Sequence, residues 1–374
     1  MKVAHLAQDW RVGGLERVAA TLVLGLRARQ VEVEAWGLSG GGPVLESLAQ
    51  AGVATRVFRH DVYLSPLAIA SVARALRATG AAIVHTHALP AGVLGRLAAL
   101  AAGAGRVHHW HTMPELRGWT ALKERLLNAC TDKIVCCADA VRRALVGGGW
   151  AKADRCSVVY NGVPAAEFDV SLRQRTSVRT RWGLADSRLA IGTIASLEPP
   201  KGHRVLLDGI PGVLARCPSA IFVWAGEGSQ AAELRTEVAA RGLEGAVRFL
   251  GLVDDVPAVL SALDLVVLPS TQREGFPLSL TEAAMAGCPA IASRLGGIPE
   301  VIEDRQTGLL VPPGDVAALT DAIVELLSSA ELRRRFGEAA RIRARARFTS
   351  EAMVDQVGAI YRAVLGPSRG RGPA

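Results

Sequence analysis

The chain has 374 residues, half of them hydrophobic, and a formal net charge of +8. This length exceeds what a single hydrophobic core usually organises, so two domains are predicted. A membrane-spanning segment is excluded because no apolar run reaches the ~18–20 residues that such a helix needs. The first residues enter a strand directly, without a basic segment and cleavage site, so no signal peptide is expected. The six cysteines contain no CxxC pair, which favours a reducing cytoplasm.

A strand, a glycine-containing loop and a helix open the chain. Residues 2–7 predict a buried strand, the following loop ends in Gly13 and Gly14, and residues 15–29 place apolar side chains at helical spacing. This order is typical of a doubly wound α/β domain, whose ligands bind at the C-terminal ends of the strands. Further strands are predicted at 31–36, 53–58, 82–86, 107–110, 133–136 and 157–160, and helices near 66–79, 90–102, 115–131 and 138–146. Because these strands are continuous apolar runs, a parallel sheet covered on both faces is expected.

A second strand–helix series follows a polar, arginine-rich stretch at 165–188 that has no core pattern. Its strands are predicted at 189–195, 220–225, 247–250, 265–268 and 290–293, and its helices near 202–216, 229–241, 256–262, 278–286 and 315–329. We therefore predict two Rossmann-like α/β domains with their boundary in the polar stretch. The predicted segments are an N-terminal domain at 1–168, a C-terminal domain at 169–349, a final helix at 350–366 and a disordered tail at 367–374.

Two carboxylates that stand eight positions apart, Glu274 and Glu282, mark the segment with the most chemical information. Pro277 closes the loop between them and precedes an alanine-rich helix, since proline is tolerated where helix amides have no intrahelical partner. Those free amides and the helix dipole favour an anion. A loop acid, a phosphate-binding helix start and a second acid therefore follow one another. A sugar–pyrophosphate–ribose compound requires this order, because carboxylates bind its hydroxyls and N–H groups bind its phosphates.

The sequence EGFPLSLTEAAMAGCPAIAS, followed by GGIPEVI and TGLLVPPGD, resembles the donor-site signature of the retaining GT-B glycosyltransferases of family 4. The resemblance implies two Rossmann-like domains that face a cleft, an acceptor-binding N-terminal domain, and a last helix that crosses back to it. It implies transfer of a hexosyl-type sugar from a nucleotide diphosphate sugar to a hydroxyl acceptor, with retention of configuration. The expected products belong to cell-envelope glycan, glycolipid or natural-product glycoside biosynthesis.

The resemblance also assigns roles to residues at the donor site. Glu274 would hold the donor-sugar hydroxyls and Glu282 the ribose hydroxyls. Lys201 would stabilise the leaving diphosphate, together with the helix start at Leu278 and Ser279.

His111, at the end of a predicted strand, resembles the family's histidine that faces the donor sugar. The remaining donor-site candidates supply backbone or shape the loops, and they are Gly13, Gly14, Gly226, Gly275, Phe276 and Pro277. One position departs from the family, because Ser196 stands where an arginine is usual. The bidentate hold of that arginine on phosphate is lost, so weaker donor binding is expected.

Five histidines form an HxH and an HHxH pattern, namely His85, His87, His108, His109 and His111. Histidines at such spacing suit zinc. No carboxylate or cysteine completes the set locally, and the resemblance implies no protein-bound metal. No cofactor and no essential metal are therefore expected, with the nucleotide sugar acting as co-substrate.

Two surface features leave the acceptor open. The seven arginines between Arg333 and Arg347 indicate a solvated helix face or a surface that attracts anionic lipid. Nucleic acid is not expected, because no aromatic residues interleave with the basic run. Trp110, Trp119 and Trp150 accompany basic residues, and they indicate either packing within the domain or an interfacial helix that reaches lipid-linked acceptors at the inner face of the membrane. The oligomeric state is not predicted.

Two rival functions fit the same residues. A nucleotide-sugar epimerase would use the same fold and donor, and the substitution at Ser196 makes a non-catalytic sugar-nucleotide-binding protein conceivable. A glycan phosphorylase is disfavoured because no lysine stands in a pyridoxal-type setting. No carboxylate pair reads as the acid and nucleophile of a glycosidase.

Overall fold

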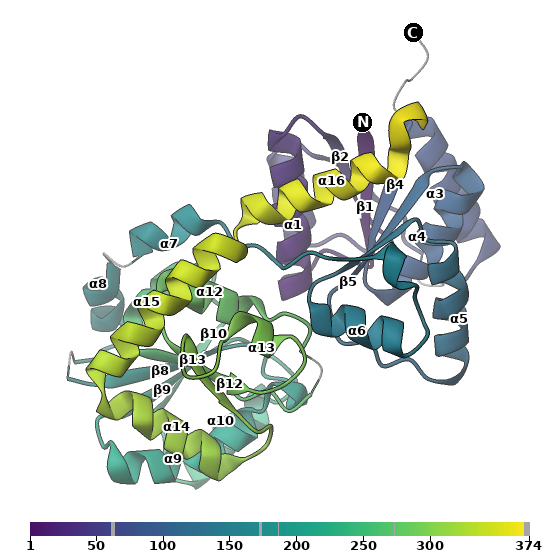
Figure 1. The fold of residues 1–374 in the computed structure, drawn as a ribbon. Helices are drawn as coiled ribbons and strands as arrows, with labels where there is room; N and C mark the ends of the chain where they lie inside the picture. Colours follow the sequence, from purple (N-terminus) through teal and green to yellow (C-terminus); the bar gives the residue numbers. More distant parts are fainter. Residues whose placement is uncertain (61–63, 172–173, 186, 273, 370–374) are drawn as a thin grey trace. The chain divides into compact units, whose positions relative to one another are not determined.

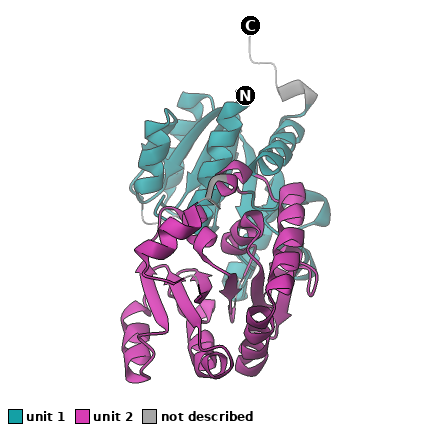
Figure 2. Cartoon of the chain, turned by 90° about the vertical axis from the view of Figure 1, so that its left-hand side faces the viewer, with its two compact units in different colours: residues 1–162, 350–374 teal, residues 163–349 magenta. Residues whose placement is uncertain are grey.

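The computed structural model describes residues 1–60, 64–171, 174–185, 187–272 and 274–369. The chain forms two compact units, of which unit 1 comprises Met1–Gly162 and the segment from Ser350 onward, and unit 2 comprises Val163–Thr349 (Figure 2). In the described part of the chain, no helix is long and apolar enough to cross a membrane.

Unit 1 is built on a seven-stranded parallel sheet in the order β3-β2-β1-β4-β5-β6-β7. Its strands are β1 (Lys2–Ala7), β2 (Glu32–Gly37), β3 (Ala54–Val57), β4 (Ile83–His87), β5 (Gly105–Trp110), β6 (Lys133–Cys136) and β7 (Cys156–Val158). Its helices are α1 (Gly14–Ala28), α2 (Pro43–Gln50), α3 (Pro66–Thr79), α4 (Leu89–Ala102), α5 (Gly118–Ala129) and α6 (Asp139–Gly147), with a short 3₁₀ turn, η1 (Ala153–Arg155). The strand order reverses between β1 and β4, where open α/β sheets bind their ligands.

The last helix, α16 (Ser350–Arg369), packs against α1 and β5 of unit 1 (Figure 1). Its Tyr361 is fully buried, and its hydroxyl bonds to histidine rings of the sheet. The predicted return of the last helix to the N-terminal domain is therefore confirmed. The helix continues to Arg369 across a break at Gly366 (φ 61°), so the predicted tail begins later than position 367. Residues 370–374 of that tail lie outside the described residues.

Unit 2 is built on a six-stranded parallel sheet in the order β10-β9-β8-β11-β12-β13. Its strands are β8 (Leu189–Ile194), β9 (Ala220–Ala225), β10 (Val247–Gly251), β11 (Leu265–Leu268), β12 (Ala290–Ser293) and β13 (Gly308–Val311). Its helical segments are α7 (Ala165–Ser171), α8 (Arg175–Arg181), η3 (Pro199–Lys201), α9 (His203–Arg216), α10 (Ala231–Ala240), α11 (Val256–Ala262), α12 (Leu278–Ala286), α13 (Ile298–Val301), α14 (Val316–Ser328) and α15 (Ala330–Arg347). The sheet reverses its order between β8 and β11.

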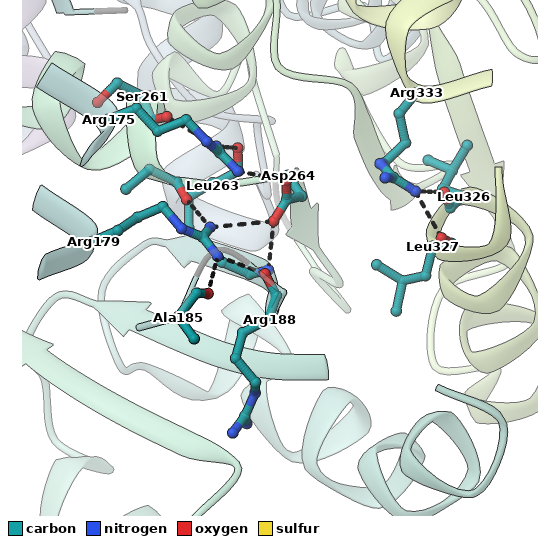
Figure 3. Close-up of polar contacts among 12 residues, drawn as sticks. Arg175, Arg179, Ala185, Arg188, Ser261, Leu263, Asp264, Leu326, Leu327 and Arg333 are labelled. Atoms are coloured by element: carbon teal, nitrogen blue, oxygen red, sulfur yellow. Dashed lines mark hydrogen bonds and ion pairs between the residues drawn. The ribbon is translucent and has the colours of Figure 1, made fainter. Parts of the chain in front are cut away.

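The arginine-rich stretch before β8 belongs to unit 2 rather than to a linker. Arg179 is almost fully buried and donates to the carbonyl oxygens of Ala185 and Arg188, at 2.9 and 2.6 Å (Figure 3). Asp264 accepts from Arg175 at 2.8 Å and from Arg179 at 3.4 Å. The predicted boundary between 168 and 169 falls within α7, which packs against α11 and α12 of unit 2. The stretch lacks an apolar pattern and was therefore predicted as the domain boundary. It nevertheless packs into unit 2, because its arginines are buried with carbonyl and carboxylate partners.

Helix α15 carries the basic run, and part of that run has structural partners. Arg333 donates from one guanidinium nitrogen to the carbonyl oxygens of Leu326 and Leu327, both at 2.7 Å (Figure 3). Both acceptors lie in the last turn of α14, where helix carbonyls have no intrahelical donor. Arg343 donates to the carbonyl oxygen of Glu300 at 2.9 Å. These contacts favour the structural interpretation of the run for Arg333 and Arg343.

Candidate active site

The candidate site in unit 2 lies where the sheet order reverses. Ser196 and Lys201 follow β8, and Glu274 follows the adjacent strand, β11. The ammonium of Lys201 lies 2.6 Å from Oε1 of Glu274, and the hydroxyl of Ser270 donates to the same oxygen at 2.6 Å. Glu274 is 4% exposed, so its carboxylate is a buried charge whose cation comes from the neighbouring loop. The structure thus brings two of the predicted catalytic side chains into direct contact.

Two glycine positions hold these loops against each other. Gly202 adopts a left-handed conformation (φ 72°), and a Cβ there would overlap the carbonyl oxygen of Pro269 in the loop after β11. The same loops are joined by the amide of Thr271, which donates to the carbonyl of Pro200 at 2.8 Å. Gly226, which follows β9 with φ 146°, leaves no room for a Cβ beside the carbonyl oxygen of Ala195. Glycine at position 202 therefore allows the close backbone approach that sets Lys201 beside Glu274, and glycine at position 226 allows the loop after β9 to approach the end of β8.

Ser196 is an exposed residue next to the Gly226 turn. The amide of Leu197 donates to the carbonyl of Glu227 at 3.0 Å and ties the two loops together. Arg204, near the start of α9, pairs with Glu233 and Glu237 of α10. The guanidinium of Arg204 is thus held on the outside of α9.

Helix α12 begins directly after the Glu274 loop. Pro277 occupies its N-cap position and makes no side-chain cap to the first turn of this helix, which starts at Leu278 and Ser279. Its first amides therefore point toward the loop as donors for an anion. Glu282 is the fifth residue of the helix and is 1% exposed.

The backbone around Glu274 is also fixed. Gly275 and Phe276 are buried, and the Phe276 ring packs edge-on against Phe348 at 5.2 Å. The amide of Gly297 donates to the carbonyl oxygen of Glu274 at 3.2 Å. These contacts hold the acid loop from both sides, as a binding site that depends on position requires.

The remaining predicted residues, Gly13, Gly14 and His111, belong to unit 1. Gly13 is the N-cap of α1 and Gly14 its first residue, at the end of β1 beside the reversal of strand order. His111 follows β5 and is half-buried, with its Nε2 3.0 Å from Nδ1 of His87. Burial lowers the pKa of His111 to about 3, so its ring is neutral near pH 7.

Two family models match the chain. The model described as Glycosyltransferase Family 4 matches residues 12–167, and the model described as Glycosyl transferases group 1 matches residues 188–329. The chain belongs to the family 4 glycosyltransferases. The resemblance read from the sequence is thereby confirmed.

Curated relatives are also glycosyltransferases or related synthases. The chain is 32% identical over 193 residues to N-acetyl-alpha-D-glucosaminyl L-malate synthase of Bacillus anthracis, covering 52% of this chain and 50% of the relative. It is 38% identical over 169 residues to phosphatidyl-myo-inositol mannosyltransferase of Mycobacterium leprae, covering 45% and 44%. Identity to glycogen synthase of Mycobacterium tuberculosis is 30% over 265 residues, covering 70% and 61%. The family 4 chain spans about half the length of the first two relatives in these matches.

Solved structures confirm the GT-B fold. The Anabaena protein Alr3699/HepE in complex with UDP-glucose superposes with a TM-score of 0.87 at 24% identity, covering 97% of this chain and all of that one. Sucrose-phosphate synthase from Thermosynechococcus elongatus superposes with a TM-score of 0.80 at 21% identity, covering 97% of this chain and 99% of that one.

The sequence does not predict Ser270 as a partner of Glu274, because a single serine four positions before an acid carries no recognisable signal.

Proposed function

We propose that this family 4 chain is a retaining enzyme that transfers a hexosyl group from a nucleotide diphosphate sugar to a hydroxyl acceptor. The observation that carries the proposal is the cluster of Lys201, Glu274 and Ser270 at the point where the sheet of unit 2 reverses, directly before the uncapped start of α12. A cation, an acid and free helix amides in this order suit a diphosphate with a sugar attached.

The two acids divide the donor between them. Among the described residues, both donors on the Glu274 carboxylate use Oε1, so Oε2 remains for a sugar hydroxyl. Glu282 lies further along the same segment, within α12, and would accept from the ribose hydroxyls. Lys201 and the α12 amides would neutralise the charge that develops on the departing diphosphate.

Retention of configuration would follow from departure and attack on the same face of the sugar. The carboxylate of Glu274 already balances the ammonium of Lys201 and accepts a hydrogen bond from Ser270. It is therefore suited to accept hydrogen bonds from sugar hydroxyls rather than to attack the sugar as a nucleophile. The leaving phosphate would then take the proton of the acceptor hydroxyl. Neutral His111 would position the sugar through a hydrogen bond. No metal is required, because the lysine and the helix amides supply the positive charge.

The donor is proposed to be a nucleoside diphosphate hexose, in line with the Anabaena structures in complex with UDP and UDP-glucose. The experiment is a released-nucleotide assay with UDP, GDP and ADP sugars across a panel of hydroxyl acceptors. Anomeric configuration of the product is read by NMR. Glu274→Gln should strongly reduce acceptor-dependent release. Sugar interconversion without an acceptor would instead indicate an epimerase, and binding without turnover on any acceptor would indicate a non-catalytic protein.

A lipid-linked acceptor at the cytoplasmic face of the membrane is supported by α5. Its residues Trp119, Leu122 and Leu126 are 72%, 47% and 59% exposed, whereas its buried residues are the polar Glu124 and Asn128. A helix with its apolar side outward suits an interfacial contact.

Co-sedimentation with anionic vesicles tests this contact. Replacing Trp119, Leu122 and Leu126 together by serine should reduce binding. The control is Leu100→Ser, because Leu100 is also exposed but lies on α4. Equal loss in both variants would refute the role of α5.

A further inference from the structure

Five histidines gather on one face of the unit 1 sheet. His5 lies on β1, His85 and His87 lie on β4, and His109 lies on β5, with His111 immediately after that strand. In the parallel register His5 is opposite His85, and His87 is opposite His109. The first four are fully buried. Side chains two apart on a strand share a face, so the sequence pattern brings the rings together.

Most of these rings are linked by hydrogen bonds. The Tyr361 hydroxyl lies 2.5 Å from Nδ1 of His85 and 3.2 Å from Nε2 of His5. Nδ1 of His5 lies 3.1 Å from Nε2 of His87, and Nδ1 of His87 lies 3.0 Å from Nε2 of His111. The chain of contacts therefore runs from the α16 hydroxyl to the half-buried His111.

His109 is the exception. Both of its ring nitrogens are buried, and neither has a hydrogen-bond partner in the described part of the chain. Its ring stacks on His111 with centroids 3.9 Å apart. A buried imidazole without a partner is costly, since buried polar atoms are normally satisfied. The two ring nitrogens of His109 are therefore available to bind a ligand.

We propose that His87, His109 and His111 bind a transition-metal cation such as Zn²⁺. One ring nitrogen from each lies within 4.8 Å of the others. Nitrogens at about 2.0–2.1 Å from a tetrahedral ion are roughly 3.3 Å apart, and the facing nitrogens of His87 and His111 are 3.0 Å apart. Small rotations of the side chains would close the set around an ion.

The ligand type selects the class of cation. Three imidazoles without a carboxylate favour zinc, nickel, copper or cobalt over magnesium and calcium. Three protein ligands leave a fourth position for water or another ligand, and half-buried His111 gives access to it.

A second trio, His5, His85 and His87, also lies within 4.8 Å. Tyr361 already bonds to two of its members, His5 and His85. These residues serve better as the outer partners that orient His87, as carboxylates and hydroxyls do at other metal sites. We therefore assign the metal site to His87, His109 and His111, the trio that contains the unpartnered ring of His109.

If the proposed function is correct, a metal bound at this site should also affect sugar transfer. A metal held by His111 would occupy the ring that is proposed to position the donor sugar. Zn²⁺ is then an inhibitor of transfer rather than a cofactor, which agrees with an enzyme that works without metal. Metal binding itself does not depend on this role.

The test begins with full-length protein that has been stripped with EDTA and dialysed. Zn²⁺ is titrated by calorimetry, and Co²⁺ binding is followed by its visible absorption, which reports the ligand field. Wild type should bind one ion. His109→Gln and His111→Gln should each weaken binding by about a hundredfold or more, and His5→Gln by about ten- to a hundredfold as an outer partner.

The matched control is His108→Gln. His108 lies on the same strand but contacts Thr86 at 2.8 Å on the opposite side, so this variant should bind as wild type does. Thermal unfolding of each stripped variant identifies any that fail to fold, and half-buried His111 is the position least prone to this.

Absence of binding by wild type would overturn the proposal. So would binding that His109→Gln and His111→Gln leave unchanged, or binding that only His5→Gln abolishes, because the ion would then lie in the other trio. If one Zn²⁺ binds as expected but transfer continues unaffected, the metal site stands and the sugar-positioning role of His111 fails.

Discussion

Lys201 and Glu274, 73 positions apart, meet as a 2.6 Å ion pair at the reversal point of the unit 2 sheet. The pair links the residue expected to bind phosphate with the residue expected to bind the sugar. Removing either partner leaves the other with an uncompensated charge in a site where Glu274 is nearly buried. The two residues must therefore be tested together.

A double-mutant cycle should reveal strong coupling between them. Glu274→Gln and Lys201→Met should each lower kcat more than they change KM, because sugar orientation and leaving-group charge matter most in the transition state. The double variant should be less impaired than the sum of the single losses, with a coupling of about 0.5–3 kcal/mol. The measurement is steady-state kinetics with the preferred donor. Strict additivity would mean that the ion pair does not organise the site.

Glu282 should act on the nucleotide rather than on the sugar. Glu282→Gln is expected to weaken nucleoside diphosphate binding by roughly 1.5–3 kcal/mol, the usual contribution of a hydrogen bond to a charged group. Glu274→Gln should leave diphosphate affinity nearly unchanged. Calorimetric titration of both variants makes the comparison, and unchanged affinity in Glu282→Gln would contradict the ribose role.

Ser196→Arg should tighten diphosphate binding by up to about tenfold, near 1.4 kcal/mol. Ser196 is exposed, so a longer side chain has room, and Arg204 is engaged with Glu233 and Glu237. The control is Ser196→Gln, which adds length without charge. A gain that both variants share would argue against a charge effect, and tight wild-type binding that survives Lys201→Met would indicate another cation.

The parts of the candidate site that lie close together in the sequence could be predicted from it. The segment from Glu274 to Glu282 carries its acids, its helix start and its glycines within a few residues, so the sequence predicted the helix at 278–286 correctly, and the roles of the two acids remain predictions. The Lys201–Glu274 contact was not predicted, because it depends on the approach of two loops at Gly202.

Other features escaped because their signals are ambiguous. Strand β13 has only four residues, and the arginines of α8 resemble a solvated linker until their carbonyl partners are known. His5 stood alone in the sequence, and only the register of β1 with β4 brings it to His85. Polar residues are read as exposed by default, so buried polar networks are the part that a pattern fails to predict.

Acid should destabilise unit 1 through its buried histidines. Burial lowers the pKa of His5 to about 3, and burial is also the main cause that lowers the pKa of His87 well below its usual value. The unfolded chain binds these protons near pH 6.5 and the folded chain does not, so stability is complete above pH 6.5 and falls as the pH drops toward 3.

Each such histidine should contribute a slope of about 1.4 kcal/mol per pH unit in that window. Urea denaturation in EDTA at pH 7, 5.5 and 4.5 measures the slope. His5→Asn removes one titrating ring and should flatten the dependence. A stability that does not change between pH 7 and 4.5 would contradict neutral, buried rings.

A buried ion pair joins α4 to α5. Arg96 donates to Glu124 at 2.6 Å and to Asn128 at 2.8 Å, and the side chains of Arg96 and Glu124 are 2% and 0% exposed. Glu124→Leu should cost about 3–5 kcal/mol, because it leaves a buried guanidinium without its carboxylate. Arg96→Met combined with Glu124→Leu should recover much of that loss. As a control, Asp208→Ala breaks an exposed pair with Arg241 and should cost about 1 kcal/mol or less.

The Arg96–Glu124 pair also holds the polar side of α5 inward and Trp119 outward, so Glu124→Leu should weaken vesicle binding as well as stability. Loss of stability with unchanged vesicle binding would separate the ion pair from the proposed membrane contact.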